Sequence, residues 1–283
     1  MILVVNKPKD FTSRDVVNKL THIFHTKKIG HTGTLDPIAT GVLACCIDED
    51  TKLVEILTSD QKEYIATMKL GIETDTLDIT GNTINTKEFN VNKELIINTL
   101  NSFVGETMQE VPLYSAIKIN GKKLYEYARE GIEVELPKHK INIYEIELLE
   151  YNNDLIKFRV LVSKGTYIRS LIRDIAHKLN TVGTMTDLIR TKQGDFRIED
   201  SYTLEEIENG NYKTITREEV LSYLESYDID DKEYQSIKNG NLLPNKYTND
   251  IVSLKYNNKI VALYQKYEKD NNFYKPYKMF IKE

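Results

Sequence analysis

The sequence has little cysteine and no long apolar run, and both absences narrow the possible classes of protein. Its two cysteines, Cys45 and Cys46, are adjacent within the apolar segment 42–47. A disulfide between neighbours would be strained, and no CxxC or Cys/His spacing accompanies them, so we interpret both as small buried apolar side chains. The five histidines form no ligand pattern either. The sequence therefore predicts no metal site.

No apolar stretch approaches the roughly 20 residues that cross a bilayer. The first eight residues lack a basic lead and a small-residue cleavage site, so they indicate a first strand rather than a signal peptide. With 40% apolar and 29% charged residues, the 283-residue chain has a globular composition. Its length suits one large domain and one small one. We expect a cytoplasmic protein without a membrane span.

Charge is in slight acidic excess, with a net charge of −5, which argues mildly against a nucleic-acid partner. The charge is segregated, however. Residues 113–197 hold 15 Lys and Arg against 11 Asp and Glu, whereas residues 198–250 hold 5 against 13. Because phosphate responds to the local patch rather than to the net charge, the first of these regions permits a basic surface that faces RNA.

Helical periodicity is clearest at two places. Thr12 with Asp15 three residues later has the spacing of a capping box, and an apolar face follows to Phe24. After the turn 163–167, apolar residues repeat at helical spacing from Ile168 to Leu179, with Arg169 on a different face. Residues 92–103 also read as a helix.

Apolar and polar residues alternate in segments 64–70 and 156–162, as expected of strands, and again in short pieces of the last 55 residues or so. The segments 30–41 and 71–81 read as a glycine-bearing loop and a polar turn. Strands and helices mix without strict βαβ alternation, which predicts an α+β fold.

The most informative segment is residues 30–43, GHTGTLDPIATGVL. Its three glycines allow tight turns and close approach of a ligand. Pro37 biases Asp36 towards extended geometry, so the carboxylate is held in a rigid loop. Taken alone, such a carboxylate more often caps a turn than performs chemistry.

This segment resembles the signature of the TruB family of tRNA pseudouridine-55 synthases, with every fixed position present. Further blocks resemble the family in the same order across residues 1–200. They are Lys62–Tyr64 with Leu70–Asp78, Val111–Lys118 with Gly121–Gly131, Ser163–Arg169, and Leu188–Arg190. The chain is thus identified as similar to the bacterial, stand-alone type of this family.

The resemblance implies roles for particular residues. Asp36 corresponds to the catalytic aspartate, Tyr64 to a tyrosine that stacks on the target base, and Arg169 to the arginine that pairs with the aspartate. The residues that it assigns to substrate binding are Tyr167 and Leu188 as pocket-lining residues, His31 as a histidine implicated in base flipping, and Gly33 and Thr34 of the signature. Lys118, which lies in a basic run with Lys122 and Lys123, is a further candidate for substrate binding as a phosphate contact.

The implied chemistry suits these residue types. Pseudouridine forms when the N1–C1′ bond breaks, the uracil rotates and a C5–C1′ bond forms, so no redox cofactor, metal or nucleotide is required. A carboxylate can form a covalent adduct and leave again, and a paired guanidinium keeps it ionised and oriented. Attack at C1′, attack at C6 and a glycal route all remain open.

The resemblance further implies a catalytic domain over residues 1–226, with a mixed, largely antiparallel central sheet flanked by helices. Residues 227–283 resemble the small β-rich PUA module that binds RNA, on the segments Asn239–Pro244 and Lys275–Phe280. The implied substrate is the T-arm of tRNA, whose target base must leave its stack. We expect a monomer that needs no protein partner and no cofactor.

Three alternatives remain open at this stage. The chain could be a non-catalytic RNA-folding protein on the same scaffold, although Asp36, Tyr64 and Arg169 are all present. It could be the catalytic subunit of a guide-RNA-dependent complex, which has a related core. A glycosidase or nucleosidase would use an aspartate together with a second carboxylic acid, and no partner is obvious beside Asp36.

Overall fold

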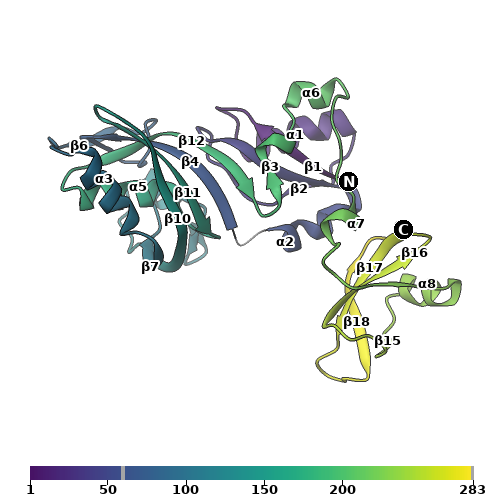
Figure 1. Cartoon of the computed structure of the whole chain (residues 1–283). Coiled ribbons are helices and arrows are strands. Elements are labelled where there is room, and N and C mark those ends of the chain that lie inside the picture. The colour runs from purple at the N-terminus through teal and green to yellow at the C-terminus, as the bar shows by residue number, and fades with distance from the viewer. Residues whose placement is uncertain (59–60, 282–283) are drawn as a thin grey trace.

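The computed structural model describes residues 1–58 and 61–281, which build two large β-sheets and two small hairpins, with helices packed against them (Figure 1). The larger sheet has nine strands and the C-terminal sheet has five. The strands of the larger sheet are β1 (Ile2–Lys7), β2 (Ile29–His31), β3 (Thr40–Ile47), β4 (Gln61–Leu70), β7 (Gly105–Glu110), β10 (Lys138–Asn152), β11 (Leu155–Ser163), β12 (Gly183–Gln193) and β13 (Phe196–Arg197).

Two small hairpins extend from this sheet. Some helices lie between its strands along the chain, and the others follow its last strand. The hairpins are β5 (Ile72–Thr74) with β6 (Thr83–Thr86), and β8 (Lys118–Ile119) with β9 (Lys122–Lys123). The helices are α1 (Ser13–Phe24), α2 (Val54–Leu57), α3 (Lys93–Asn101), α4 (Leu124–Glu130), α5 (Ile168–Lys178), α6 (Leu204–Glu208), α7 (Arg217–Val220) and α8 (Asp231–Lys238), with short 3-10 turns at Asp48–Leu53 and Ile198–Asp200.

The strand order of the larger sheet is β1-β3-β12-β4-β11-β10-β7, with β2 beside β3 and β13 beside β12. Among the strand pairings that the structure describes within this larger sheet, β3 with β12 is parallel and the others are antiparallel. The predicted α+β class with a mixed, largely antiparallel central sheet is confirmed. The parallel pairing places Thr40 and Gly41, which follow Asp36 closely in the sequence, directly beside β12.

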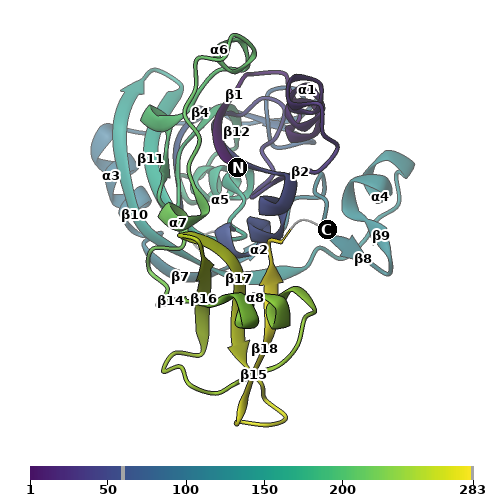
Figure 2. The same ribbon diagram turned by 90° about the vertical axis from the view of Figure 1, so that its right-hand side faces the viewer.

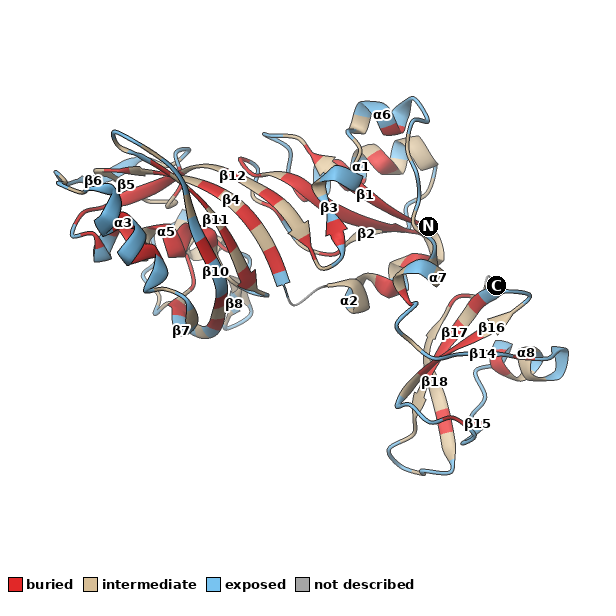
Figure 3. Cartoon of the chain, in the orientation of Figure 1, coloured by how far each residue is buried: buried red, intermediate tan, exposed pale blue. Residues whose placement is uncertain are grey.

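The helices α3 and α5 cover one face of the larger sheet (Figure 1). The main hydrophobic core lies between these helices and the sheet. The strands β4 and β11 alternate buried and partly exposed residues along their length, as their sequence pattern predicts (Figure 3). In α5 the apolar residues from Ile168 to Ala176 are buried against this core. The core thereby fixes the backbone position of the first turn of α5.

A second core lies where α1 and α6 pack on β1 and β3. The predicted capping box of α1 is confirmed, since the Thr12 side chain accepts from the Asp15 amide while the Asp15 carboxylate accepts from the Thr12 amide. Cys45 and Cys46 lie buried in β3, free of any disulfide, as predicted. No helix in the described part of the chain is long and apolar enough to cross a bilayer.

The C-terminal sheet consists of β14 (Ser226–Asp228), β15 (Leu243–Pro244), β16 (Ile251–Tyr256), β17 (Lys259–Lys266) and β18 (Phe273–Met279). It has its own core and projects below the larger sheet (Figure 2). Phe280 and Ile260 also pack against Leu221 and the larger sheet, so an apolar contact joins the two parts. The predicted domain boundary after residue 226 stays a prediction, and residues 282 and 283 of the predicted module lie outside the described residues.

Two segments differ from their predicted form. The loop predicted over 30–41 is shorter, because residues 29–31 form β2, which pairs with β3 and leaves residues 32–39 as the connection. The polar turn predicted over 71–81 begins with the strand β5. Both strands are short pieces whose partner lies several residues away along the chain, so local alternation does not reveal them.

Candidate active site

Asp36 lies in the connection between β2 and β3. The Leu35 amide donates to the Ser13 hydroxyl on α1 at 2.9 Å, and the Ala39 amide donates to the Asp36 carbonyl at 3.0 Å. The following residue, Pro37, has its carbonyl bound by the Asp10 amide at 2.8 Å. These contacts fix the backbone on both sides of Asp36. Its side chain keeps 34% of its surface exposed and faces a cavity.

Arg169, in the first turn of α5, binds the Asp36 carboxylate through two contacts. Its Nε lies 2.9 Å from Oδ2, and its Nη2 donates to Oδ1 at 3.1 Å. The same guanidinium donates to the carbonyls of Thr76 and Tyr114, each at 3.0 Å. Only 7% of the Arg169 side chain is exposed, so the charge is buried and its donors are occupied. A planar group held at four places orients the carboxylate in one plane.

A second carboxylate, Asp78, lies 4.0 Å from the Nη1 atom of Arg169. Its Oδ1 accepts from the amide and the hydroxyl of Thr80, and its backbone carbonyl accepts from Thr74. Asp78 is buried and directed at the guanidinium rather than at the cavity, whose lining it does not join. Its charge therefore balances Arg169, and Asp36 remains the carboxylate that is open to a ligand.

Tyr64 and Leu188 lie on the neighbouring strands β4 and β12 and face the same cavity as Asp36. The Tyr64 side chain is nearly buried, with 7% of the residue exposed, and Leu188 is 5% exposed. The cavity measures about 500 Å³, which is within the range of small-ligand sites. It is lined by Gly33, Thr34, Leu35, Asp36, Lys62, Tyr64, Tyr114, Ser115, Tyr125, Lys164, Tyr167, Arg169, Leu188 and Arg190, among others.

Tyr167 borders this cavity just before α5. The Gln109 side chain holds its backbone on both sides, since it accepts from the Tyr167 amide at 2.8 Å and donates to the Tyr167 carbonyl at 3.1 Å. The ring stacks on His139 with a centroid distance of 6.1 Å. Burial raises the pKa of the Tyr167 phenol above its ordinary value, so the hydroxyl remains protonated at neutral pH.

Two residues assigned to substrate binding lie outside the cavity lining. His31 is in β2, and its Nδ1 is buried without a hydrogen-bond partner among the described residues. Burial, together with the nearby cations Arg190 and Arg14, lowers the pKa of His31. Lys118 is exposed on the β8–β9 hairpin, near α4 at the edge of the molecule (Figure 2). The structure thus gathers Asp36, Tyr64, Arg169, Tyr167, Leu188, Gly33 and Thr34, and leaves His31 and Lys118 apart.

Sequence reasoning missed several residues around Asp36. The ammonium of Lys7 is fully buried and donates to the carbonyls of Pro8, Phe11 and Pro37. Burial lowers the pKa of Lys7 to about 8, against an opposing effect of Asp36. The sequence feature that could have indicated a buried Lys7 is its position at the end of an apolar strand, directly before a proline. Tyr114 was missed because it contributes a backbone carbonyl, which no side-chain pattern reports.

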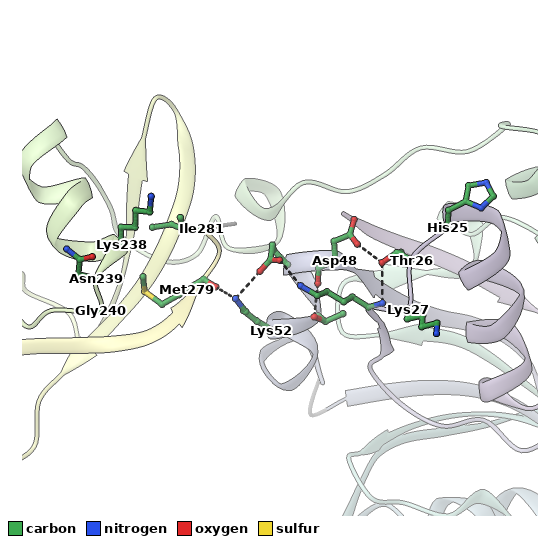
Figure 4. Close-up of a pocket in the computed structure, with 13 residues that line it drawn as sticks. His25, Thr26, Lys27, Asp48, Lys52, Lys238, Asn239, Gly240, Met279 and Ile281 are labelled. Atoms are coloured by element: carbon green, nitrogen blue, oxygen red, sulfur yellow. Dashed lines mark hydrogen bonds and ion pairs between the residues drawn. The ribbon is translucent and has the colours of Figure 1, made fainter. Parts of the chain in front are cut away.

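A larger cleft of about 1180 Å³ lies between the nine-stranded sheet and the C-terminal sheet (Figure 4). Neither Asp36 nor Arg169 lines it. It is lined by residues 25–28, 48, 49, 51 and 52 on one side and by 238–240, Met279 and Ile281 on the other. Lys52 bridges it, because its Nζ donates to the Met279 carbonyl at 2.6 Å and pairs with Glu49 at 2.9 Å. None of the residues predicted for catalysis lines this cleft. Volume alone therefore does not locate the active site.

Comparison with known proteins identifies the family to which this fold and site belong. Residues 21–168 match the model described as TruB family pseudouridylate synthase (N terminal domain), and residues 169–227 match that of the tRNA pseudouridylate synthase B C-terminal domain. A protein named tRNA pseudouridine synthase B from Clostridium tetani is 45% identical over 94% of this chain and 95% of its own. One of the same name from Geobacillus thermodenitrificans is 39% identical over 99% of each chain.

Two solved structures share the architecture. A chain in the crystal structure of a Cbf5–Nop10–Gar1 complex aligns over 99% of this chain and 84% of its own, with a TM-score of 0.73 and 26% identity. A chain in the structure of an H/ACA RNP bound to a substrate RNA containing 2′-deoxyuridine aligns over 99% of this chain and 85% of its own, with a TM-score of 0.68 and 25% identity. The protein is thus a pseudouridine synthase by class. The chain belongs to the TruB family.

Proposed function

We propose that this chain converts the uridine at position 55, in the T-loop of tRNA, into pseudouridine. The observation that carries the proposal is the Arg169–Asp36 pair, in which a buried guanidinium holds both oxygens of a carboxylate that faces a cavity beside Tyr64. The name tRNA pseudouridine synthase B, borne by relatives that match nearly the whole chain, supports tRNA as the substrate.

Asp36 is the proposed nucleophile. Its carboxylate is held by Arg169 and is exposed enough to reach a ligand. Tyr64 offers a stacking face for the extracted base, a contact that is worth about 1–3 kcal/mol. Tyr167 and Leu188 close the apolar sides of the pocket, while Gly33 and Thr34 bring the backbone close to the base.

The reaction is an isomerisation, so its atoms balance without a co-reactant. The N1–C1′ bond breaks, the detached uracil turns within the pocket and C5 bonds to C1′. The proton on C5 leaves, and N1 gains a proton. Asp36 forms a covalent adduct and is released unchanged, so neither a cofactor nor a metal takes part in the proposed scheme.

The target base must leave the T-loop stack to reach Asp36. His31, at the end of β2 directly before the connection that carries Asp36, is proposed to assist this extraction. Lys118, on the exposed hairpin, is a proposed phosphate contact outside the pocket. The residues after 226 are proposed as an RNA-binding module of the PUA type. We further infer a monomer that acts without a protein partner in the cytoplasm.

The direct test is to incubate the purified protein with an unmodified tRNA transcript alone and to map pseudouridine along the RNA. We expect one pseudouridine, at position 55, and none in a matched transcript that carries cytidine there. Modification that needs an added guide RNA or protein partner would favour a subunit of a larger complex. Binding of tRNA without any product would favour the RNA-folding alternative.

A further inference from the structure

Arg190 on β12 carries a buried charge that the scheme above leaves without a role. Its side chain is fully buried, and among the described residues it forms no ion pair with a carboxylate. A buried cation is costly unless hydrogen bonds satisfy its donors. The hydrogen-bond partners given for the Arg190 side chain are backbone carbonyls, those of Gly33 and Val42. We therefore ask what Arg190 does for the segment that contains these two residues.

The guanidinium binds both ends of the segment that contains Asp36. Its Nε donates to the Val42 carbonyl at 2.7 Å, and its Nη2 donates to the Gly33 carbonyl at 3.0 Å. Gly33 lies three residues before Asp36 and Val42 six residues after it. One planar group therefore fixes the separation of Gly33 and Val42, which lie on either side of Asp36.

The backbone of Arg190 makes a third and a fourth contact. It pairs with Gly41 in the parallel register of β3 and with Tyr64 in the antiparallel register of β4. Gly41 has a φ of 98°, and a Cβ there would lie 2.3 Å from the Arg190 carbonyl oxygen, so only glycine permits this approach. Arg190 is thus the residue that joins the Asp36 segment to the strand of Tyr64.

Gln193, also on β12, binds Thr32, the residue directly before Gly33. Its Nε2 donates to the Thr32 carbonyl at 3.1 Å and to the Thr32 hydroxyl at 2.7 Å. Thr32 and Gln193 are both buried. The first residue of the 33–42 segment, Gly33, and the residue before it, Thr32, are therefore both held to β12.

We propose that Arg190 is a positioning residue that sets the placement of Asp36 relative to Tyr64 by holding both ends of the 33–42 segment. The proposal rests on the proposed function, because it assigns Arg190 to that reaction. Arg190 acts through the backbone and need not touch the substrate. A shift of about 1 Å in a reacting group can lower a rate on the order of 10²-fold.

The test compares Arg190→Ala and Arg190→Lys with Arg173→Ala as the matched control. Arg173 is a mostly buried arginine of α5 that pairs with Glu110 and Asp174 and does not line the cavity. Three quantities are measured in each folded variant: the single-turnover rate at saturating enzyme, the affinity for tRNA, and amide hydrogen exchange in peptides that cover residues 33–42.

We expect Arg190→Ala to lower the single-turnover rate on the order of 10²-fold while tRNA affinity stays within about twofold. Arg190→Lys should lose most of the same rate, because an ammonium cannot satisfy two separated carbonyls in one plane. Exchange in residues 33–42 should accelerate in both variants and not in Arg173→Ala. Guanidinium ion at millimolar concentration should restore part of the rate of Arg190→Ala, and ammonium ion should not.

A folded Arg190→Ala protein with normal turnover, or with unchanged exchange in residues 33–42, overturns the proposal. A loss that appears in affinity and vanishes at saturating enzyme also overturns it, because Arg190 would then be a binding residue. Failure of both variants to fold would show a role in stability alone and would likewise overturn it. If the unaltered protein makes no pseudouridine, the proposed function fails, and hydrogen exchange still decides whether Arg190 holds the segment.

Discussion

The guanidinium of Arg169 meets the carboxylate of Asp36 edge to edge, with Nε 2.9 Å from Oδ2 and Nη2 3.1 Å from Oδ1. The two residues are 133 positions apart in the sequence. The first turn of α5 supplies one of them and the connection between β2 and β3 supplies the other. The pair fixes the direction of the carboxylate.

This geometry predicts that Arg169→Lys is nearly as damaging as Arg169→Ala. A lysine supplies one flexible point charge and cannot bind two oxygens in one plane together with the Thr76 and Tyr114 carbonyls. The backbone cannot move to compensate, because the apolar face of α5 is buried in the main core. Single-turnover assays at saturating enzyme provide the measurement. Near-normal turnover in Arg169→Lys would mean that the residue supplies only charge.

Lys7 predicts a pH dependence of stability. Burial lowers its pKa to about 8 in the folded chain, below the value of 10.5 for an exposed lysine. Between these values the unfolded chain binds more protons than the folded chain, so Lys7 makes the free energy of unfolding rise with pH from about 8 towards 10.5. Lys7→Met should lack this rise, whereas Lys9→Met, at an exposed position, should keep it. Denaturant unfolding at about pH 7.5, below the pKa of Lys7 in the folded chain, and at about pH 10, within the interval of rising stability, measures the difference. Equal pH slopes in all three proteins would show that Lys7 is not desolvated as described.

Phe280 should stabilise the contact between the two sheets. Its ring is buried beside Ile260 and Leu221, and the Arg217 guanidinium lies 3.9 Å above it. We expect Phe280→Ala to lower the free energy of unfolding by about 3 kcal/mol. Tyr223→Ala, at a residue 69% exposed, should change it by less than about 0.5 kcal/mol. Turnover at saturating enzyme should be unaffected by either change, since the residues assigned to chemistry precede residue 200. Equal stabilities of the two variants would contradict the described packing.

Exhaustive chelation should leave activity unchanged. The isomerisation needs no Lewis acid in the proposed scheme, because Asp36 supplies the nucleophile and the atoms of the base are conserved. The measurement is turnover after dialysis against EDTA, with the folding of the tRNA held constant by spermidine. A loss of activity that added Mg²⁺ or Zn²⁺ restores, with RNA folding unchanged, would count against the scheme.

The sequence predicted the local structure of the site well, because that structure depends on short-range patterns. The capping box of Thr12 and Asp15, the apolar repeat of α5 and the alternation in β4 each involve residues a few positions apart. The resemblance to TruB proteins singled out Asp36, Tyr64 and Arg169, and the structure brings these three around one cavity. Their catalytic roles stay predictions.

The contacts that hold the site could not be predicted in the same way. Periodicity placed Arg169 off the apolar face of its helix, yet it is buried because carbonyls of two distant connections and Asp36 satisfy its donors. Arg190 stood in a recognised element, but its partners Gly33 and Val42 are about 150 positions away, at separations of 157 and 148 residues. Bonds from side chains to distant carbonyls leave no local pattern.

Asp36→Asn tests the central claim most directly. The substitution keeps the shape of the side chain and removes the charge that acts as nucleophile. Pseudouridine formation at position 55 should be abolished in single-turnover reactions at saturating enzyme, while tRNA affinity and the unfolding transition remain close to those of the unaltered protein. Substantial pseudouridine formation by a verified Asp36→Asn protein, free of deamidated aspartate by mass spectrometry, would contradict the assignment of Asp36 as the catalytic residue.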